Sequence, residues 1–368
     1  MDGMPVPSPD APRAVKGRGA ASNAPGRHER TFRIGVDDGW RTSLDDPDDA
    51  SGGRTRWRED VARTIITTND SPDLHFDRSV NPYRGCEHGC IYCYARPGHA
   101  WLGHSPGLDF ERLLYAKRDA PALLRDAFSR PGYVPEPIGL GVVTDAWQPL
   151  ERELKITRRL LEVFLECRHP VLVITKASLI ERDLDLLAEL ARENLVTATV
   201  TITTLDRALS RRLEPRATAP ARRLRTLETL ARAGVPTRLS LSPVIPALNE
   251  HEIESIVEAA AGAGAVEANA IVLRLPRELG TLFEEWLRAH YPDRAERVLK
   301  AVQSIRNGRM NESDFATRML GTGPRALLIR HRFELACRRA GIGCGRRPVE
   351  LDRTRFRAPV GGGQMALF

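Results

Sequence analysis

Three cysteines lie close together in a stretch that is otherwise rich in glycine and aromatic residues. Cys86, Cys90 and Cys93 belong to the sequence Asn81-Pro-Tyr-Arg-Gly-Cys-Glu-His-Gly-Cys-Ile-Tyr-Cys-Tyr94, and the remaining cysteines of the chain are scattered. Crowded thiolates are typical ligands of iron–sulfur clusters, and one short loop can reach three irons of a cubane. Because no fourth cysteine is near, one iron would keep an open coordination position, which a catalytic site needs.

A zinc ion held by the same cysteines and one histidine is the alternative. His88 or His99 would supply the fourth ligand, and zinc accepts such a ligand set. His88 lies inside the tight loop between Cys86 and Cys90, where its ring would reach the same ion only with strain. The residues therefore favour an iron–sulfur cluster over a closed zinc site.

Short apolar runs follow the cysteines, and segments with helical patterns separate them. The runs have strand length and most are rich in β-branched residues. Repeated strand–helix alternation implies parallel strands with right-handed crossovers, so the sequence predicts an α/β fold, either a barrel or a wound sheet. The predicted strands are residues 138–144, 171–175, 196–203, 237–243 and 270–275.

Composition sets limits on the rest of the chain. Among its 368 residues no apolar run approaches the ~20 residues of a membrane helix, and residues 1–25 lack the apolar stretch of a secretory signal. We therefore expect a cytoplasmic protein without membrane contact. Residues 1–60 are rich in Gly, Pro, Asp and Arg and are predicted to be disordered or loosely attached. A helical extension is predicted over 291–345, and a basic flexible tail over 346–368.

The spacing Cys-x3-Cys-x2-Cys, with Tyr92 before the last cysteine, resembles the signature of the radical S-adenosylmethionine (SAM) superfamily. The resemblance covers roughly residues 76–290 and implies a partial (β/α)6 TIM-like barrel. It also implies a [4Fe–4S] cluster whose open iron binds the amino and carboxylate groups of SAM. An electron from a reductase or flavodoxin-type donor would then cleave SAM, and the resulting 5′-deoxyadenosyl radical would remove a hydrogen atom from the substrate.

Three stretches are similar to the spore-photoproduct-lyase-like branch of that superfamily, whose members are described as DNA repair photolyases. The resemblance implies a relative of the lyase rather than the lyase itself, acting on a DNA base lesion turned out of the stack into the barrel. The stretches are Asn81 through Arg96, Thr144–Glu151 and Ile174–Ser178.

The resemblance also implies roles for individual residues. Lys176, after the third predicted strand, would bind the SAM carboxylate, although a solvated lysine fits the pattern as well. Asp145 could instead be an acid at a helix N-terminus, and threonines at strand ends also follow from β-propensity. The other implied roles are Cys86, Cys90 and Cys93 as cluster ligands, Tyr92 near the adenine, Thr144 and Asp145 at the SAM amino group, and Thr203 as a hydroxyl contact.

The pattern departs from that of the lyase at one position. The lyase has a cysteine near the end of its second strand that donates a hydrogen atom to the product radical, whereas this chain has Gly141-Val-Val-Thr144 there. Tyr94 or Tyr92 would have to relay hydrogen instead. The motif therefore does not predict spore photoproduct reversal by the same route.

Basic segments predict a nucleic-acid partner, with DNA favoured. The net charge is +7, and arginines cluster over 205–240 and 325–357. Clustered guanidinium groups suit phosphate contacts, although a charge run is also an ordinary solvated surface. Radical modification of RNA or protein is the second hypothesis. A non-catalytic iron–sulfur or zinc module that binds nucleic acid is the third.

The last five residues, Gln364-Met-Ala-Leu-Phe368, resemble the clamp-binding peptide of bacterial replication and repair proteins. They follow a glycine-rich link and would place two apolar anchors in a pocket, so the DNA polymerase sliding clamp is a predicted partner. An apolar terminus that docks on its own domain is the alternative. Cys337 and Cys344 fit no metal-binding spacing and are predicted to be small buried residues.

Overall fold

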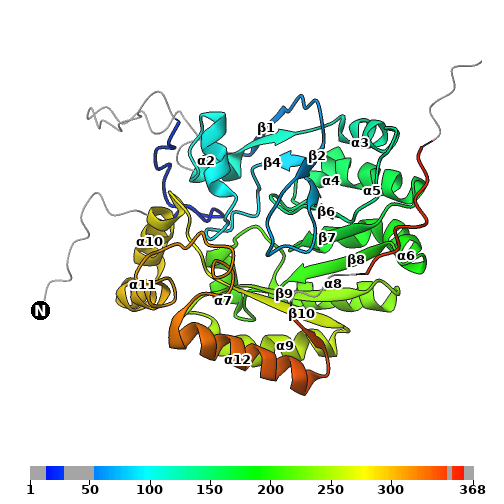
Figure 1. The fold of residues 1–368 in the computed structure, drawn as a ribbon. Helices are drawn as coiled ribbons and strands as arrows, with labels where there is room; N and C mark the ends of the chain where they lie inside the picture. The colour runs from blue at the N-terminus through cyan, green and yellow to red at the C-terminus, as the bar shows by residue number, and fades with distance from the viewer. Residues whose placement is uncertain (1–13, 29–53, 346–349, 360–368) are drawn as a thin grey trace, which may run out of the picture.

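The computed structural model describes residues 14–28, 54–345 and 350–359, and an eight-stranded sheet lies at its centre (Figure 1). The strand order is β11-β10-β9-β8-β7-β6-β3-β2. The six strands from β3 to β10 in this order are parallel, β11 continues the parallel pairing at one edge, and β2 is antiparallel at the other. The strands are β2 (Ile66–Thr68), β3 (Arg78–Val80), β6 (Ile138–Leu140), β7 (Val171–Thr175), β8 (Val196–Thr201), β9 (Thr237–Val244), β10 (Glu267–Val272) and β11 (Gly343–Cys344).

A second, three-stranded sheet of order β1-β5-β4 carries the chain into the cysteine loop. β1 (Arg56–Glu59) runs parallel to β5 (Leu113–Ala116), and β4 (Tyr83–Arg84) pairs antiparallel with β5. Two short helices, η1 (Arg96–Leu102) and α2 (Leu108–Arg112), complete the connection from β4 to β5. The cysteines therefore lie on a connection whose two ends are fixed in one sheet.

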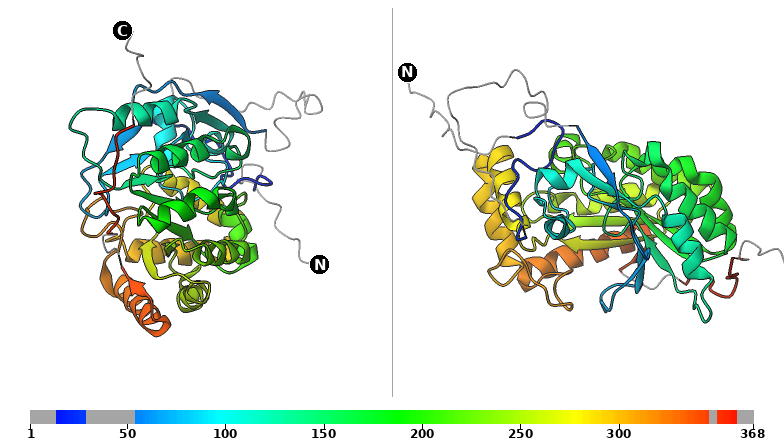
Figure 2. Two further views of the ribbon diagram at one scale, coloured as in Figure 1. Left: turned by 90° about the vertical axis from the view of Figure 1, so that its right-hand side faces the viewer. Right: turned by 90° about the horizontal axis from the view of Figure 1, so that it is seen from above.

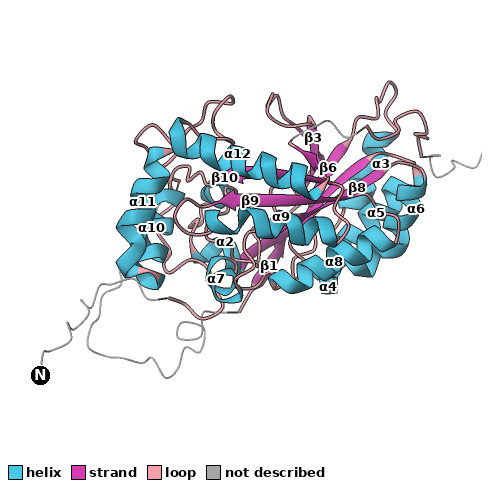
Figure 3. Cartoon of the chain, turned by 90° about the horizontal axis from the view of Figure 1, so that it is seen from below, coloured by secondary structure: helices cyan, strands magenta, loops and turns pink. Residues whose placement is uncertain are grey.

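Helices connect successive parallel strands and cover the outer side of the large sheet (Figure 3). In the view from above, α10 and α11 stand at the opposite end of the molecule from α5 and α6 (Figure 2). The helices are α3 (Ala120–Phe128), α4 (Glu151–Leu154), α5 (Ile156–Glu166), η2 (Ser178–Asp183), α6 (Leu184–Arg192), α7 (Arg207–Leu213), α8 (Pro220–Arg232), η3 (Glu250–Glu252), α9 (Ile253–Gly262), α10 (Leu279–His290), η4 (Pro292–Arg294), α11 (Ala295–Ser304) and α12 (Gly323–Ala340).

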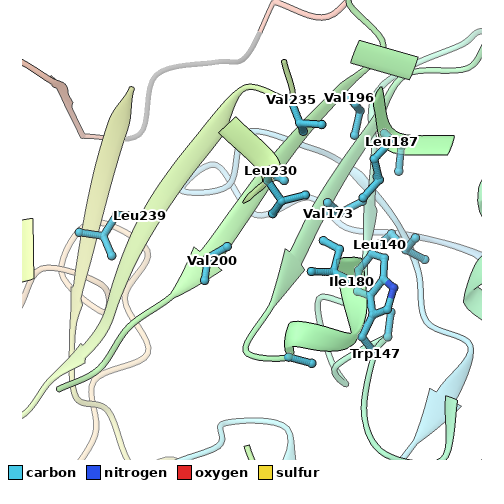
Figure 4. Packing of buried hydrophobic residues seen from close by; sticks show 14 of the residues in the cluster. Leu140, Trp147, Val173, Ile180, Leu187, Val196, Val200, Leu230, Val235 and Leu239 are labelled. Atoms are coloured by element: carbon cyan, nitrogen blue, oxygen red, sulfur yellow. The ribbon is translucent and has the colours of Figure 1, made fainter. Parts of the chain in front are cut away.

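The main core fills the space between the strands and the helices that cover them. Val173 and Val200 from neighbouring strands meet Leu187 of α6 and Leu230 of α8, and all four side chains are buried (Figure 4). Fully burying such a side chain contributes about 1.5–3 kcal/mol. This apolar layer fixes the strands from outside, so the strand ends can carry polar residues.

The predicted fold class is confirmed, since the chain forms an α/β partial barrel built from parallel strands. The strand predicted over 138–144 ends at Leu140. Gly141 follows with a φ of +78°, and a Cβ there would lie 3.0 Å from the backbone nitrogen of Ala146. The tight turn that the glycine permits ends the strand early and leaves Val142, Val143 and Thr144 in a loop at the carboxyl edge of the sheet.

Part of the N-terminal region differs from the predicted loose attachment. Residues 14–28 run between α2 and α10 (Figure 1), where Ser22 Oγ donates to Glu285 at 2.6 Å and Arg27 pairs with Glu278 at 3.0 Å. Ala20 is fully buried. Composition suggested disorder, but these contacts join residues about 70–260 positions apart in the chain, which local patterns do not reveal.

The C-terminal region is only partly described. Within 350–359, Leu351 is buried and Phe356 packs edge-on against the rings of Phe128 and His169, so these residues are not the flexible tail that the sequence predicted. The predicted clamp-binding peptide, Gln364–Phe368, lies outside the described residues. Within the described residues, no helix combines the length and apolarity that crossing a membrane would require.

Candidate active site

The cysteine loop is fastened to two separate parts of the chain, α2 and the end of α7. The Cys86 N–H donates to the Phe110 carbonyl at 3.0 Å, and the Ile91 N–H donates to the Leu213 carbonyl at 2.9 Å. Gly89 has a φ of +69°, and a Cβ there would lie 2.7 Å from Glu111 Oε2. The loop therefore depends on glycine for its path and on neighbouring carbonyls for its position.

A buried ion pair lies directly behind the loop. Arg96 donates from Nε to the Cys90 carbonyl at 2.8 Å and from Nη2 to the Gly89 carbonyl at 3.0 Å. The same guanidinium pairs with Glu111 at 2.5 Å, and neither side chain is exposed to solvent. Glu111 also accepts from the N–H groups of Gly19 and Ala20, at 3.0 and 2.9 Å. The pair thus links the cysteine loop to α2 and to the N-terminal segment.

The three thiols suit a shared cluster. Cys86 and Cys90 are buried, and Cys93 packs against the apolar clusters that contain each of them. Burial raises the pKa of Cys86 and raises that of Cys90 to about 12. Both thiols therefore keep their protons in the metal-free chain and would release them on binding a metal. Among the described residues, no group of three or more His, Cys, Asp or Glu side chains is arranged so that it could hold a single metal ion. A cubane asks for a different arrangement, because each thiolate binds its own iron.

The two histidines considered as zinc ligands already have protein partners. His88 Nδ1 lies 3.4 Å from Asp145 Oδ2, and both side chains are buried. His99 Nε2 lies 2.9 Å from the Leu113 carbonyl, with its ring edge-on to Phe110. The donor set that faces the loop interior is therefore sulfur, which fits iron.

Thr144 and Asp145 lie in the loop that follows β6, not at the end of the strand, and their polar atoms hold neighbouring loops. Asp145 accepts from the Lys176 N–H at 2.7 Å and from Thr175 Oγ1 at 2.8 Å. Burial alone would raise the pKa of Asp145, but His88 outweighs it and lowers the pKa to about 2. Thr144 Oγ1 donates to the Tyr83 carbonyl at 3.1 Å. Their contact with the SAM amino group stays a prediction.

Lys176 and Tyr92 meet beside Cys90. The Lys176 ammonium lies 5.8 Å from the centre of the Tyr92 ring, and no hydrogen bond or ion pair of this ammonium occurs within the described part of the chain. Burial would lower the pKa of Lys176, but the electrostatic effects of Cys90 and Glu214 raise it, which keeps the ammonium charged. Lys176 is thus a half-buried cation with no fixed partner next to a cluster cysteine.

The Tyr92 hydroxyl belongs to a buried polar network that sequence reasoning did not find. It donates to Glu214 and lies 3.2 Å from Thr203 Oγ1. Glu214 in turn pairs with Arg223 at 2.6 Å, and both side chains are almost fully buried. The predicted residues Tyr92 and Thr203 are therefore brought together, and Glu214 and Arg223 anchor them.

Tyr94 points to the end of β6, where the chain lacks the thiol of the lyase. Its hydroxyl donates to the Val142 carbonyl at 2.5 Å, and the guanidinium of Arg274 lies 5.2 Å from the centre of its ring. Tyr94 is 43% exposed, whereas Tyr92 is 7% exposed. Of the two tyrosines proposed to relay hydrogen, Tyr94 is therefore the one that a substrate can reach.

Most of the described arginines in the two basic segments pair with carboxylates of the same chain. Such pairing leaves less positive charge for phosphate groups than the sequence suggested. The paired arginines are Arg216 with Glu87, Arg222 with Glu181, Arg223 with Glu214, Arg232 with Glu228, Arg238 with Glu267, Arg325 with Glu250, Arg330 with Glu334, Arg332 with Glu254, Arg353 with Glu136, and Arg355 with Asp352.

Known relatives match both the sequence and the fold. The uncharacterized protein Rv2578c of Mycobacterium tuberculosis is 31% identical over 226 residues, which cover 61% of this chain and 66% of that protein. The uncharacterized protein MJ0683 of Methanocaldococcus jannaschii is 28% identical over 173 residues, covering 47% of this chain and 62% of that protein. This chain thus spans about two thirds or less of the length of these relatives.

Solved structures of spore photoproduct lyase share the fold. The lyase complexed with dinucleoside spore photoproduct has a TM-score of 0.56 at 15% identity and covers 78% of this chain and 81% of its own. A variant of that lyase with bound AdoMet and dinucleoside spore photoproduct has a TM-score of 0.53 over the same shares. The model of the radical SAM superfamily matches residues 80–260, which include the three cysteines. Residues 80–260 of the chain therefore form a radical SAM domain, and the cofactors of that superfamily are a [4Fe–4S] cluster and SAM.

Proposed function

We propose that this chain is a radical SAM enzyme in which Cys86, Cys90 and Cys93 hold the cluster and Lys176 binds the SAM carboxylate. One observation carries the proposal: three thiols on a largely buried loop lie beside an ammonium group that forms no ion pair with any described residue. Burying a charge without a partner is costly, so such a cation suits a ligand that supplies a carboxylate. When bound, the cluster and SAM supply a radical that removes a hydrogen atom from the substrate.

The surrounding residues prepare this site. Arg96 holds the carbonyls on either side of Cys90, which keeps the loop in place when the cluster is absent. Asp145 fixes the backbone of Lys176 and thereby sets the point from which its side chain starts. Thr203, beside the Tyr92 hydroxyl, offers a polar contact for SAM on the same wall of the barrel.

We further propose that the substrate is DNA carrying a base lesion and that Tyr94 donates a hydrogen atom to the product radical, after which an electron from the reductant and a proton restore the phenol. The fold shared with a lyase solved with a dinucleoside lesion supports this, as does the phenol of Tyr94 at the end of β6. Desolvation of the hydroxyl raises the pKa of Tyr94 to about 12, so the phenol keeps its hydrogen at neutral pH. The flavodoxin-type electron donor and the sliding clamp at Gln364–Phe368 stay predictions.

The test is anaerobic reconstitution with iron and sulfide, followed by SAM and a reductant. We expect about four irons per chain and release of 5′-deoxyadenosine, as a cubane on three thiolates requires. Cys90→Ala should abolish both. The matched control is Cys167→Ala, which removes an equally buried thiol outside the loop and should leave both unchanged. Zinc uptake without 5′-deoxyadenosine in the wild-type chain would overturn the proposal.

The same assay tests Tyr94 when UV-irradiated thymine oligonucleotide is added. In Tyr94→Phe, we expect fewer lesions repaired for each SAM cleaved, because the ring remains but the hydrogen donor is lost. An unchanged ratio would remove the role of Tyr94.

A further inference from the structure

Four side chains line one side of the barrel mouth next to the cysteine loop, and we call them the mouth patch: Tyr94, Arg274, Phe315 and Arg318. Arg274 follows the end of β10, and its guanidinium lies 5.2 Å from the centre of the Tyr94 ring. Arg318 lies 4.4 Å from the centre of the Phe315 ring. Each of the two guanidinium groups therefore lies against one aromatic ring.

The charges of this patch do not cancel. Asp73 holds Arg318 through two hydrogen bonds of 2.5 Å, which neutralises that guanidinium. Arg274 has no hydrogen bond or ion pair anywhere in the described ranges 14–28, 54–345 and 350–359. Its guanidinium contacts the ring of Tyr94. Burial first, and then the nearby Arg318, lower the pKa of Arg274 from its ordinary value.

A third arginine holds the backbone of the patch in place. Arg306 is buried and donates to the carbonyls of Val272 and Leu273 at 2.9 and 2.8 Å, and to that of Arg318 at 2.8 Å. Its guanidinium thus joins the end of β10 to the segment that carries Arg318. Carbonyl oxygens take up its hydrogen bonds but contribute no negative charge, so the local excess of positive charge remains.

The rings of the patch are open to a ligand. Tyr94 is 43% exposed and Phe315 is 44% exposed. Exposed aromatic rings beside guanidinium groups are the usual platform for unstacked bases of a nucleic acid, because the rings stack on bases and the cations bind phosphates. An acidic peptide would use the cations but has no need of the rings.

We infer that the mouth patch binds one nucleotide of single-stranded or flipped-out DNA, with a backbone phosphate on Arg274 and a base against Phe315 or Tyr94. This inference rests on the proposed function and adds the residues that recognise its substrate. Tyr94 directly follows the cluster ligand Cys93, so a nucleotide on the patch lies beside the loop where the chemistry starts. The patch thereby brings the lesion to the barrel.

The test is equilibrium binding of fluorescein-labelled pentathymidylate to the reconstituted full chain, measured by anisotropy with and without a neutral methylphosphonate backbone. We expect the wild type to bind the phosphodiester about tenfold more tightly than the neutral analogue, which corresponds to about 1.4 kcal/mol. Arg274→Gln should lose this preference, and Arg274→Lys should retain part of it. Equal binding of the phosphodiester by Arg274→Gln and the wild type would overturn the inference.

Two controls separate the patch from general charge and from misfolding. Arg225→Gln removes an exposed arginine of α8 and should bind both oligonucleotides as the wild type does. Phe315→Ala should weaken the binding of both oligonucleotides by a similar factor of about 10, because base stacking does not depend on the backbone charge. Circular dichroism of each variant checks that the fold is retained.

Two further outcomes assign a failure to its cause. Displacement of the oligonucleotide by a glutamate-rich peptide at equal concentration would overturn the inference and make the patch a peptide site. A wild-type chain without iron or 5′-deoxyadenosine would overturn the proposed function, while phosphate-dependent binding lost in Arg274→Gln would still support the patch as a nucleotide site.

Discussion

The charges behind the cysteine loop are paired, whereas two cations in front of it are not. Behind the loop, Arg96 pairs with Glu111 and Arg223 pairs with Glu214, all of them almost fully buried. In front, Lys176 and Arg274 each contact a tyrosine ring of the cysteine motif and, among the described residues, no carboxylate. Proteins pair buried charges because isolated ones are costly. The difference therefore separates charged groups that hold the loop in place from charged groups that are available to a ligand.

The same difference changes how the basic segments are understood. The sequence pointed to arginine runs at 205–240 and 325–357 as the nucleic-acid surface, but carboxylates of the same chain hold many of these groups. Other arginines of these runs, such as Arg207 and Arg225, are exposed on the outer helices, whereas Arg274 lies beside the tyrosine of the cysteine motif.

Breaking a pair behind the loop should have the largest effect. In Glu111→Gln, Arg96 keeps its charge but loses its counter-ion in a fully buried place, and we expect a loss of about 3–5 kcal/mol in the free energy of unfolding. Urea unfolding of the cluster-free chain measures it. Glu166→Gln is the control, because its pair with Arg125 is 45% exposed on each side and should contribute less than about 1 kcal/mol. Equal losses in the two variants would contradict the distinction between the two regions.

Removing a cation in front of the loop should affect ligand binding instead of folding. In Lys176→Met, we expect SAM affinity to fall about 10–100-fold, as the loss of one hydrogen bond to a charged group would cause. The free energy of unfolding should stay the same or rise, since the ammonium has no partner to lose among the described residues. Calorimetric titration of SAM, with exposed Lys300→Met as the control, measures the affinity. Unchanged SAM binding would show that Lys176 belongs with the structural charges.

The smallest effect is expected where the N-terminal segment meets the loop from behind. A Cβ on Gly19 would lie 1.7 Å from the Gly89 carbonyl oxygen, so Gly19→Ala should release residues 14–28. The cost cannot exceed the free energy of docking that segment, which we expect to be about 1–2 kcal/mol for a few hydrogen bonds. Limited trypsin digestion should become faster at Arg18 and Arg27. Gly98→Ala, where no atom lies within 4 Å of the added Cβ, should digest as the wild type does.

The cysteine motif and the parallel strands could be predicted from sequence because both depend on local spacing. Strand length and β-branching located β7 and β9, and the three thiols lie within one loop. The groups that hold the loop could not be found in this way. Glu214 lies 122 residues from Tyr92, and neither has a pattern that names the other. The two ends of a long-range contact become visible only when the sheet brings them together.

Asp145 shows a second limit. Its place near a strand end was predictable, but its hydrogen bonds to Thr175 and to the Lys176 N–H were not, because they depend on how far β7 extends beside β6. A residue type at a strand end indicates that chemistry is possible there. Whether its oxygens are available to a ligand depends on the neighbouring loops.

The contact between the N-terminal segment and Glu111 also bears on how the chain is made. Gly19 leaves the ribosome 92 residues before the carboxylate that accepts its N–H. At 5–20 residues per second, the segment waits roughly 5–20 s for its binding place. The thiols of the loop emerge during that interval. The carbonyl of Leu213, which accepts from the Ile91 N–H, is made later still, so the loop is fully held only after much of the barrel has been synthesised.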